Sequence, residues 1–246
     1  MADEKPMTLI EHLEELRHRI IVSALAILVA AAAAFFLSEV LLRVLLLPSR
    51  GLQLNAFSLM DGFMIKWRIA LYSGIVVSFP VWAYELLRFI GPGMTEQERR
   101  AIFPTLWGAL VLFVIGVVFG YYLLSGMIHV LVQFFPPEVR YLASADDYIS
   151  FVVFFLLACG VAFQLPILLT ILIQLRILST DLLRKQRRIA YFALFAFAEV
   201  ITPVSDPIVA PLTVMGPLIL LYELSIWLGR GIERRRKPSA GEQLAS

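Results

Sequence analysis

Residues 101–128 read AIFPTLWGALVLFVIGVVFGYYLLSGMI, and residues 148–175 read YISFVVFFLLACGVAFQLPILLTILIQL. Neither run of 28 residues contains Asp, Glu, Lys or Arg. About 20 consecutive apolar residues span the hydrocarbon layer of a bilayer, which is about 30 Å thick. Apolar residues make up 60% of the chain and the mean hydropathy is +0.83, whereas soluble domains contain about 45–50% apolar residues. The sequence therefore predicts an integral membrane protein.

The fold class that we predict is all-α, a polytopic membrane protein with six transmembrane helices. The expected spans are Ile20–Leu37, Trp67–Leu87, Ile102–Leu124, Tyr148–Leu175, Ile189–Thr202 and Pro207–Leu228. The last two helices are expected to be short, because about 14–17 apolar residues reach only about 21–26 Å. The first span is expected to be retained, because it is longer than the apolar region of a signal peptide, about 7–15 residues. Prolines inside the spans are expected to kink them; these are Pro80, Pro166, Pro211 and Pro217.

The distribution of Lys and Arg predicts the orientation of these spans. Sixteen of the 21 basic residues lie in segments that would share a side with the N-terminus, and five lie on the other side. Basic residues concentrate in cytoplasmic segments, so the N- and C-termini are both predicted to be cytoplasmic. The chain would then comprise a cytoplasmic amphipathic segment (residues 1–19), a six-helix membrane domain (residues 20–228) and a basic cytoplasmic tail (residues 229–246).

The connections on the opposite side are predicted to contain structure of their own. Glu39–Leu47 has an apolar stripe and ends at Pro48, which indicates a helix lying along the membrane surface. Gly126–Asp147 is expected to form a second cap on this side. Asp146 and Asp147 directly precede the fourth span, and we interpret them as helix N-cap residues.

Motifs that would indicate an enzyme are absent from the sequence. There is no G-x-x-x-x-G-K-[ST] phosphate loop, no H-E-x-x-H, no G-x-S-x-G and no C-x-x-C. His12, His18 and His129 are not expected to form a metal site, because His129 is predicted to lie on the opposite side of the membrane. We therefore expect no enzymatic activity, no cofactor, no metal ion and no nucleic-acid partner.

Acidic residues gather at the predicted cytoplasmic edge. A Thr–Glu capping box and apolar residues at helical spacing predict a short amphipathic helix that runs into the first span. Glu14 and Glu15 follow this cap, and ion pairs with the basic residues 17–19 would give them a structural role. Thr95 and Glu98 form a second capping box, so spacing alone gives Glu98 a structural role as well.

Several segments resemble a known family. Residues 12–19, which read HLEELRHR, resemble the H-L-x-E-L-R-x-R signature of the TatC family, the multispanning component of twin-arginine protein translocases. Phe89–Glu98 resembles the family segment F-[IV]-x-P-x-L-x-x-x-E, with Met94 where Leu is usual. Further family segments are resembled, in order, by Tyr148–Phe151, Phe163–Pro166, Ile201–Pro203 and Leu221–Leu224. The resemblance extends over about residues 7–229.

The resemblance implies a receptor for signal peptides with consecutive arginines, located in the cell inner (cytoplasmic) membrane. By matching position, Glu15 and Glu98 would contact the two guanidinium groups, and Arg17, Phe89 and Pro48 match further positions on which the family depends. Guanidinium forms bidentate, charge-assisted bonds with carboxylate that Lys does not reproduce. The resemblance also implies small single-span TatA- and TatB-like subunits, a homo-oligomer within the complex, and export of folded proteins by the proton-motive force.

Two further residues are expected to contact partner helices. Gln164 stands where the family commonly has Glu, and it either bonds a carbonyl freed by Pro166 or by another helix, or offers a hydrogen bond to a partner subunit. Asp206 is matched to a family Asp, although the turn before the last span is slightly longer here. An N-cap role followed by Pro207 would also explain Asp206.

The alternative function is a secondary transporter for small solutes. Such a transporter would have an inverted repeat and discontinuous helices around charges at the membrane midplane. The sequence contains no clear repeat, and its acidic residues cluster at the predicted cytoplasmic edge.

Overall fold

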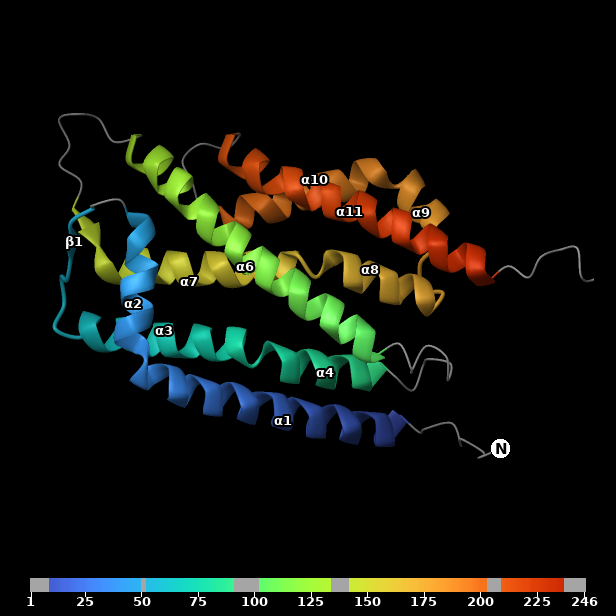
Figure 1. Cartoon of the computed structure of the whole chain (residues 1–246), viewed down its shortest axis with the longest axis horizontal. Helices are drawn as coiled ribbons and strands as arrows, with labels where there is room; N and C mark the ends of the chain where they lie inside the picture. Colours follow the sequence, from blue (N-terminus) through green and yellow to red (C-terminus); the bar gives the residue numbers. More distant parts are fainter. Residues whose placement is uncertain (1–8, 50–51, 91–101, 134–141, 203–208, 237–246) are drawn as a thin grey trace, which may run out of the picture. The chain divides into compact units, whose positions relative to one another are not determined.

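The computed structural model describes residues 9–49, 52–90, 102–133, 142–202 and 209–236 (Figure 1). The chain divides into two compact units, Met1–Leu110 with Leu142–Leu157, and Val111–Tyr141 with Ala158–Ser246. Helices α6 (Ile102–Gln133) and α7 (Ala145–Ala162) contribute residues to both units. The structure is mostly helical, as the sequence predicts.

The first unit is built on α1 (Leu9–Phe36), against which α3 (Asp61–Val77) and α4 (Phe79–Ile90) pack (Figure 1). The close approach of α1 and α3 requires Gly74, because a Cβ atom there would lie 2.7 Å from the backbone nitrogen of Ala31. Many large apolar side chains of α1 are exposed. An exposed apolar surface of this kind is typical of a helix that contacts lipid.

The segment after α1 contains the surface helix that the sequence predicts. This helix, α2 (Ser38–Leu46), continues into the short 3₁₀ helix η1 (Leu47–Ser49). Lys66 Nζ lies 3.0 Å from Glu39 Oε1, and this hydrogen bond and charge hold the pKa of Glu39 below its ordinary value. The two short strands β1 (Leu54–Asn55) and β2 (Ala143–Ser144) pair in parallel. The sequence did not predict this pair, whose strands have only two residues each.

The start of α7 differs from the sequence prediction. Ser144 is the capping residue, because its Oγ accepts a hydrogen bond of 3.3 Å from the backbone N–H of Asp147. Asp146 and Asp147 lie within the first turn of the helix, so their assignment as N-cap residues was wrong. The carboxylate of Asp146 instead forms an ion pair with Arg68, at 2.9 Å between Oδ2 and Nη1.

The second unit is organised around α11 (Val209–Arg236). This helix packs against α8 (Leu165–Gln174), α9 (Thr180–Lys185) and α10 (Arg187–Ile201). Glu223 of α11 joins two residues of α10: its Oε2 lies 2.6 Å from Arg187 Nη2, and its Oε1 accepts a hydrogen bond of 2.7 Å from Tyr191. These contacts fix α10 against α11.

Four candidate membrane spans are present in the described residues: Ile10–Phe36, Pro104–Val130, Ala145–Gln174 and Pro211–Glu233. A fifth requires α3 and α4 to act together, since they are bent by 51° relative to each other. Helix α10 has 15 residues and is short, as predicted for the fifth span. Six crossings and cytoplasmic termini stay predictions.

Prolines explain where two expected spans are broken. The second expected span is two helices, because α3 ends at Val77 and α4 contains Pro80 in its first turn, where the missing N–H costs no helical bond. The fourth expected span is also interrupted, because α8 begins at Leu165 and has Pro166 in its first turn. The last helix is not short: α11 has 28 residues and continues through its basic end, which gives it a length of about 42 Å.

Candidate functional site

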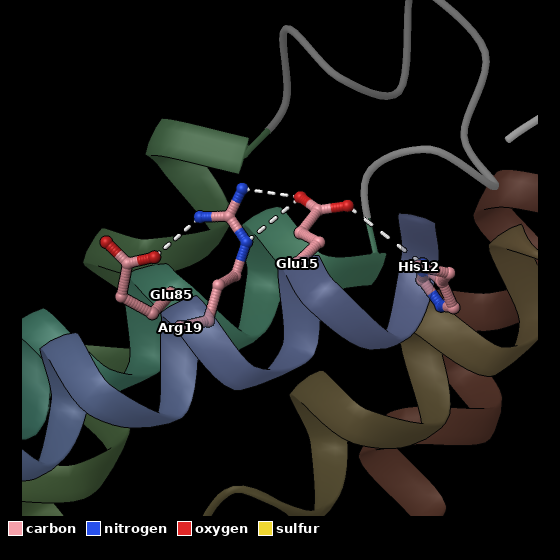
Figure 2. A network of polar contacts seen from close by, with 4 residues as sticks. All are labelled: His12, Glu15, Arg19 and Glu85. Carbon is pink, nitrogen blue, oxygen red and sulfur yellow. Dashed lines mark hydrogen bonds and ion pairs between the residues drawn. The ribbon is translucent and has the colours of Figure 1, made fainter. Parts of the chain in front are cut away.

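A charged cluster joins the N-terminal part of α1 to α4 (Figure 2). Arg19 and Glu15 lie one helical turn apart on α1, and Arg19 Nε and Nη2 both donate to Glu15 Oε1, at 3.1 and 2.6 Å. The third donor, Nη1, lies 2.5 Å from Glu85 Oε2 of α4. The guanidinium of Arg19 is therefore shared between two carboxylates on two helices.

This cluster is largely shielded from solvent. The exposed fractions of the side chains are 17% for Glu15, 14% for Arg19 and 13% for Glu85. Two carboxylates face one guanidinium, so the cluster carries a net charge of −1. Charges in such surroundings interact more strongly than on an open surface, and this excess charge favours binding of a further cation.

The second carboxylate oxygen of Glu15 lacks a hydrogen-bond partner within the described residues. Oε2 is buried, and its contact with Nδ1 of His12, 3.9 Å long, is within the range of an ion pair with a protonated imidazole but too long for a hydrogen bond (Figure 2). The ring of His12 stacks on Phe89 of α4, with centroids 4.4 Å apart and planes inclined by 12°. This stack holds the imidazole beside the free oxygen. A buried carboxylate oxygen without a partner is costly, so the site favours a ligand that donates a hydrogen bond.

A mostly apolar groove of about 370 Å³ adjoins the cluster. Side chains of α1 and α4 line it, including Leu16, Ile20, Ile27, Trp82, Leu86 and Phe89. Arg19 and Glu85 form its polar edge. The site thus combines an acidic end with an apolar surface, which suits a ligand that is cationic at one end and apolar beyond it.

The structure brings some of the predicted signal-binding residues together and separates others. Glu15 and Phe89 both lie at the cluster, whereas Arg17 is exposed on α1 and forms no ion pair within the described residues. Pro48 is buried in η1, which follows α2 at the opposite end of α1 (Figure 1), so it does not join this site. Glu98, like the predicted partner contact Asp206, lies outside the described residues.

Gln164 occupies the break between α7 and α8. Its backbone N–H bonds Val161 O rather than the carbonyl of Gly160 four residues back, which therefore does not receive its usual backbone hydrogen bond. The side-chain Nε2 lies 3.5 Å from that Gly160 oxygen, at the outer limit of a hydrogen bond. This contact is of the kind that the structural interpretation of Gln164 expects, while a contact with a partner helix is not tested by a single chain.

Sequence reasoning identified Glu15 but missed Glu85 and the bridging role of Arg19. The spacing of four residues between Glu15 and Arg19 does predict an ion pair on a helix. The pairing of Arg19 with Glu85, 66 residues later in the chain, depends on how α1 and α4 pack. An acidic residue at the edge of an apolar span is a signal that could have singled out Glu85, because such residues need a partner.

The apolar helices define a multi-pass membrane protein, and comparison with known proteins identifies its class as a component of a protein translocase. The family profile described as "Sec-independent protein translocase protein (TatC)" matches residues 11–217, and the chain belongs to the TatC family. This family supplies a transport subunit rather than a known enzyme. The comparisons do not support a solute transporter.

Individual relatives match almost the full chain. The Sec-independent protein translocase protein TatC of Carboxydothermus hydrogenoformans is 33% identical over 244 residues, which cover 98% of this chain and 99% of the relative. TatCy of Bacillus subtilis is 32% identical and covers 95% of this chain and 93% of the relative. A crystal structure of the twin arginine translocase receptor TatC in DDM superimposes with a TM-score of 0.78 at 32% identity, covering 89% of this chain and 99% of that one.

The shared guanidinium predicts the effect of replacing Arg19. Arg19→Gln leaves two partly buried carboxylates without their cation, and we expect the free energy of unfolding to fall by about 1.5–3 kcal/mol. Arg19→Lys keeps the charge but cannot reproduce the forked geometry, so its loss should be smaller. Thermal unfolding of the detergent-purified protein measures both.

Arg17→Gln provides the matched control, because it removes an exposed arginine from the same helix. It should change stability by no more than about 0.5 kcal/mol. An Arg19→Gln variant as stable as the Arg17→Gln variant would contradict a structural role for the bridge.

Proposed function

We propose that this protein is the receptor and core subunit of a twin-arginine translocase. It binds signal peptides with consecutive arginines, assembles with small single-span TatA- and TatB-like subunits, and takes part in exporting folded proteins by the proton-motive force. The observation that carries the proposal is the buried oxygen of Glu15, which accepts no hydrogen bond from any described residue, in a cluster of net charge −1. The solved relative, described as a twin arginine translocase receptor, supports the same function.

One signal guanidinium binds at Glu15. It donates to the free Oε2, while Arg19 keeps its bonds to Oε1 and to Glu85. The incoming charge neutralises the cluster, and because the side chain of Glu15 is only 17% exposed, water competes weakly for the new bond. An arginine satisfies this site better than a lysine, because its planar fork offers several donors in fixed directions.

The second guanidinium of the pair binds at Glu98, in a proposal that rests on the family resemblance alone. Arg17 and Phe89 border the same binding region, and the apolar groove of α1 and α4 offers a surface for the apolar part of the signal. Pro48 acts indirectly, by holding the end of α2 that it follows. Several copies of the chain assemble within the translocase complex.

The receptor proposal predicts the effect of removing single charges. Glu15→Gln keeps the shape of the side chain but removes the charge, and Glu98→Gln does the same at the second position. A charge-assisted hydrogen bond contributes about 1.5–3 kcal/mol, so each variant should weaken signal binding by about one to two decades. Photocrosslinking of a twin-arginine signal peptide to the protein in membranes measures this loss.

Glu14→Gln is the matched control for Glu15→Gln, because Glu14 is the adjacent acid and is exposed. It should leave crosslinking unchanged. Protein levels and melting temperatures of all variants are compared, since Glu15→Gln also weakens the bond to Arg19. Normal crosslinking by Glu15→Gln would contradict the proposed binding site at Glu15. Normal crosslinking by Glu98→Ala would show that Glu98 only caps a helix.

The partner contacts are proposed at Gln164 and Asp206. If Gln164 offers a hydrogen bond to a partner helix, Gln164→Glu should retain crosslinking to a TatA- or TatB-like subunit, whereas Gln164→Leu should lose it at an unchanged protein level. A Leu variant that crosslinks and transports normally would show that Gln164 contacts no partner helix and has at most a local role, such as its contact with Gly160. A Leu variant that fails to accumulate would show a structural role instead.

A further inference from the structure

A second cavity, distinct from the groove of α1 and α4, lies within the second unit. It has a volume of about 770 Å³ and is formed by the end of α8, by α9 and by the C-terminal part of α11. Volumes of about 300–1,000 Å³ are typical of ligand sites. Neither the family comparison nor the proposed receptor function uses this cavity.

Three arginines line the cavity: Arg176, Arg184 and Arg230. None of them forms an ion pair or a hydrogen bond through its side chain within the described residues. Arg176 and Arg184 are exposed, and Arg230 is half-buried. Three guanidiniums around one cavity form a geometry that suits phosphate, because each can donate two parallel bonds to phosphate oxygens.

Two acidic residues also line the cavity, and their positions leave a positive balance. Both oxygens of Glu233 are directed to Thr180, with Oε1 accepting from its backbone N–H at 3.0 Å and Oε2 accepting from its hydroxyl. Asp181 is exposed. Three guanidiniums and two carboxylates give a net charge of +1, which a ligand with a single negative charge would balance.

The backbone at Arg176 gives an independent indication that its side chain matters. Its φ is 61°, and it is the one non-glycine residue with positive φ within the described part of the chain. Hydrogen bonds from Arg176 N to Ile173 O and from Ile177 N to Leu172 O, 3.1 and 3.0 Å long, form a Schellman motif at the end of α8. Glycine is the favoured residue at this position, so an arginine here accepts an unfavourable conformation and projects a guanidinium at the cavity.

The walls of the cavity are fixed in position. A Cβ atom on Gly229 would lie 2.5 Å from Ile173 and 2.8 Å from Thr180, so glycine allows α11 to approach α8 and α9 closely. The bonds between Thr180 and Glu233 fasten the same junction. The backbone segments that carry Arg176, Arg184 and Arg230 are thereby held around a preformed space, which reduces the entropy lost on binding.

We propose that this cavity binds the phosphate headgroup of an anionic phospholipid, with Arg176, Arg184 and Arg230 as its ligands. The phosphodiester of phosphatidylglycerol carries the single negative charge that the site requires. The rim includes the exposed apolar side chains of Ile177 and Leu182, which are 63% and 38% exposed. These apolar groups contact acyl chains, whereas a free phosphate would leave them unused. Basic pockets between membrane helices are typical sites for such headgroups.

The experiment titrates the full-length protein, purified in a neutral detergent, with phosphatidylglycerol and measures retained lipid by native mass spectrometry. Arg176→Gly removes a guanidinium and relieves the positive φ, so this variant should melt at the same temperature or higher and bind the lipid about tenfold more weakly. Arg230→Gln should show a similar loss. Arg188→Gln, which removes an exposed arginine outside the cavity, should bind like the unmodified protein.

Two further arms test the chemistry of the ligand. Phosphatidylcholine, which has no net charge, should bind at least tenfold more weakly than phosphatidylglycerol, and inorganic phosphate at millimolar concentration should not displace the lipid. The site would be overturned if Arg176→Gly bound the lipid as tightly as the unmodified protein. It would also be overturned if Arg188→Gln lost as much affinity for the lipid as Arg176→Gly. Equal retention of phosphatidylcholine would overturn charge recognition, and displacement by inorganic phosphate would overturn the assignment to a lipid. All these outcomes are independent of signal binding.

Discussion

The guanidinium of Arg19 links three features of the first unit. Its Nε and Nη2 bind Glu15 on the same helix, and its Nη1 binds Glu85 on α4. Because the guanidinium is rigid and planar, these bonds fix the distance between α1 and α4. The apolar groove lies between these two helices, and Arg19 and Glu85 form its polar edge. One side chain therefore contributes both to the packing of the helices and to the candidate site.

The same arrangement leaves a carboxylate available for recognition. Arg19 bonds only one oxygen of each acid, so Glu15 Oε2 retains its acceptor capacity. One guanidinium facing two carboxylates leaves the cluster a charge of −1. A fully neutralised cluster would hold the helices together without attracting a cation. A cluster without Arg19 would place two carboxylates close together, which is unfavourable. One guanidinium for two acids combines a bond between two helices with an acidic candidate site.

The sequence predicted what depends on local pattern. Apolar runs predicted the long helices, and Pro80 and Pro166 lie where the second and fourth expected spans are interrupted. The spacing of four residues indicated the ion pair of Glu15 with Arg19. Contacts between distant segments could not be predicted, because the pairing of Arg19 with Glu85 and of β1 with β2 depends on tertiary packing. Hydropathy also misjudged α11, since helical structure continues into its charged end. The partner contacts proposed for Gln164 and Asp206 would involve other chains, which one sequence does not contain.

We propose that the acidic cluster recognises the guanidinium group itself rather than positive charge in general. The most direct measurement compares the affinity of the purified protein for two signal peptides that differ only in having two arginines or two lysines. The several donors that a guanidinium holds in fixed directions predict that the arginine peptide binds at least about tenfold more tightly, and that Glu15→Gln removes most of this difference. Equal affinities for the two peptides, or a preference that persists in Glu15→Gln, would contradict the claim.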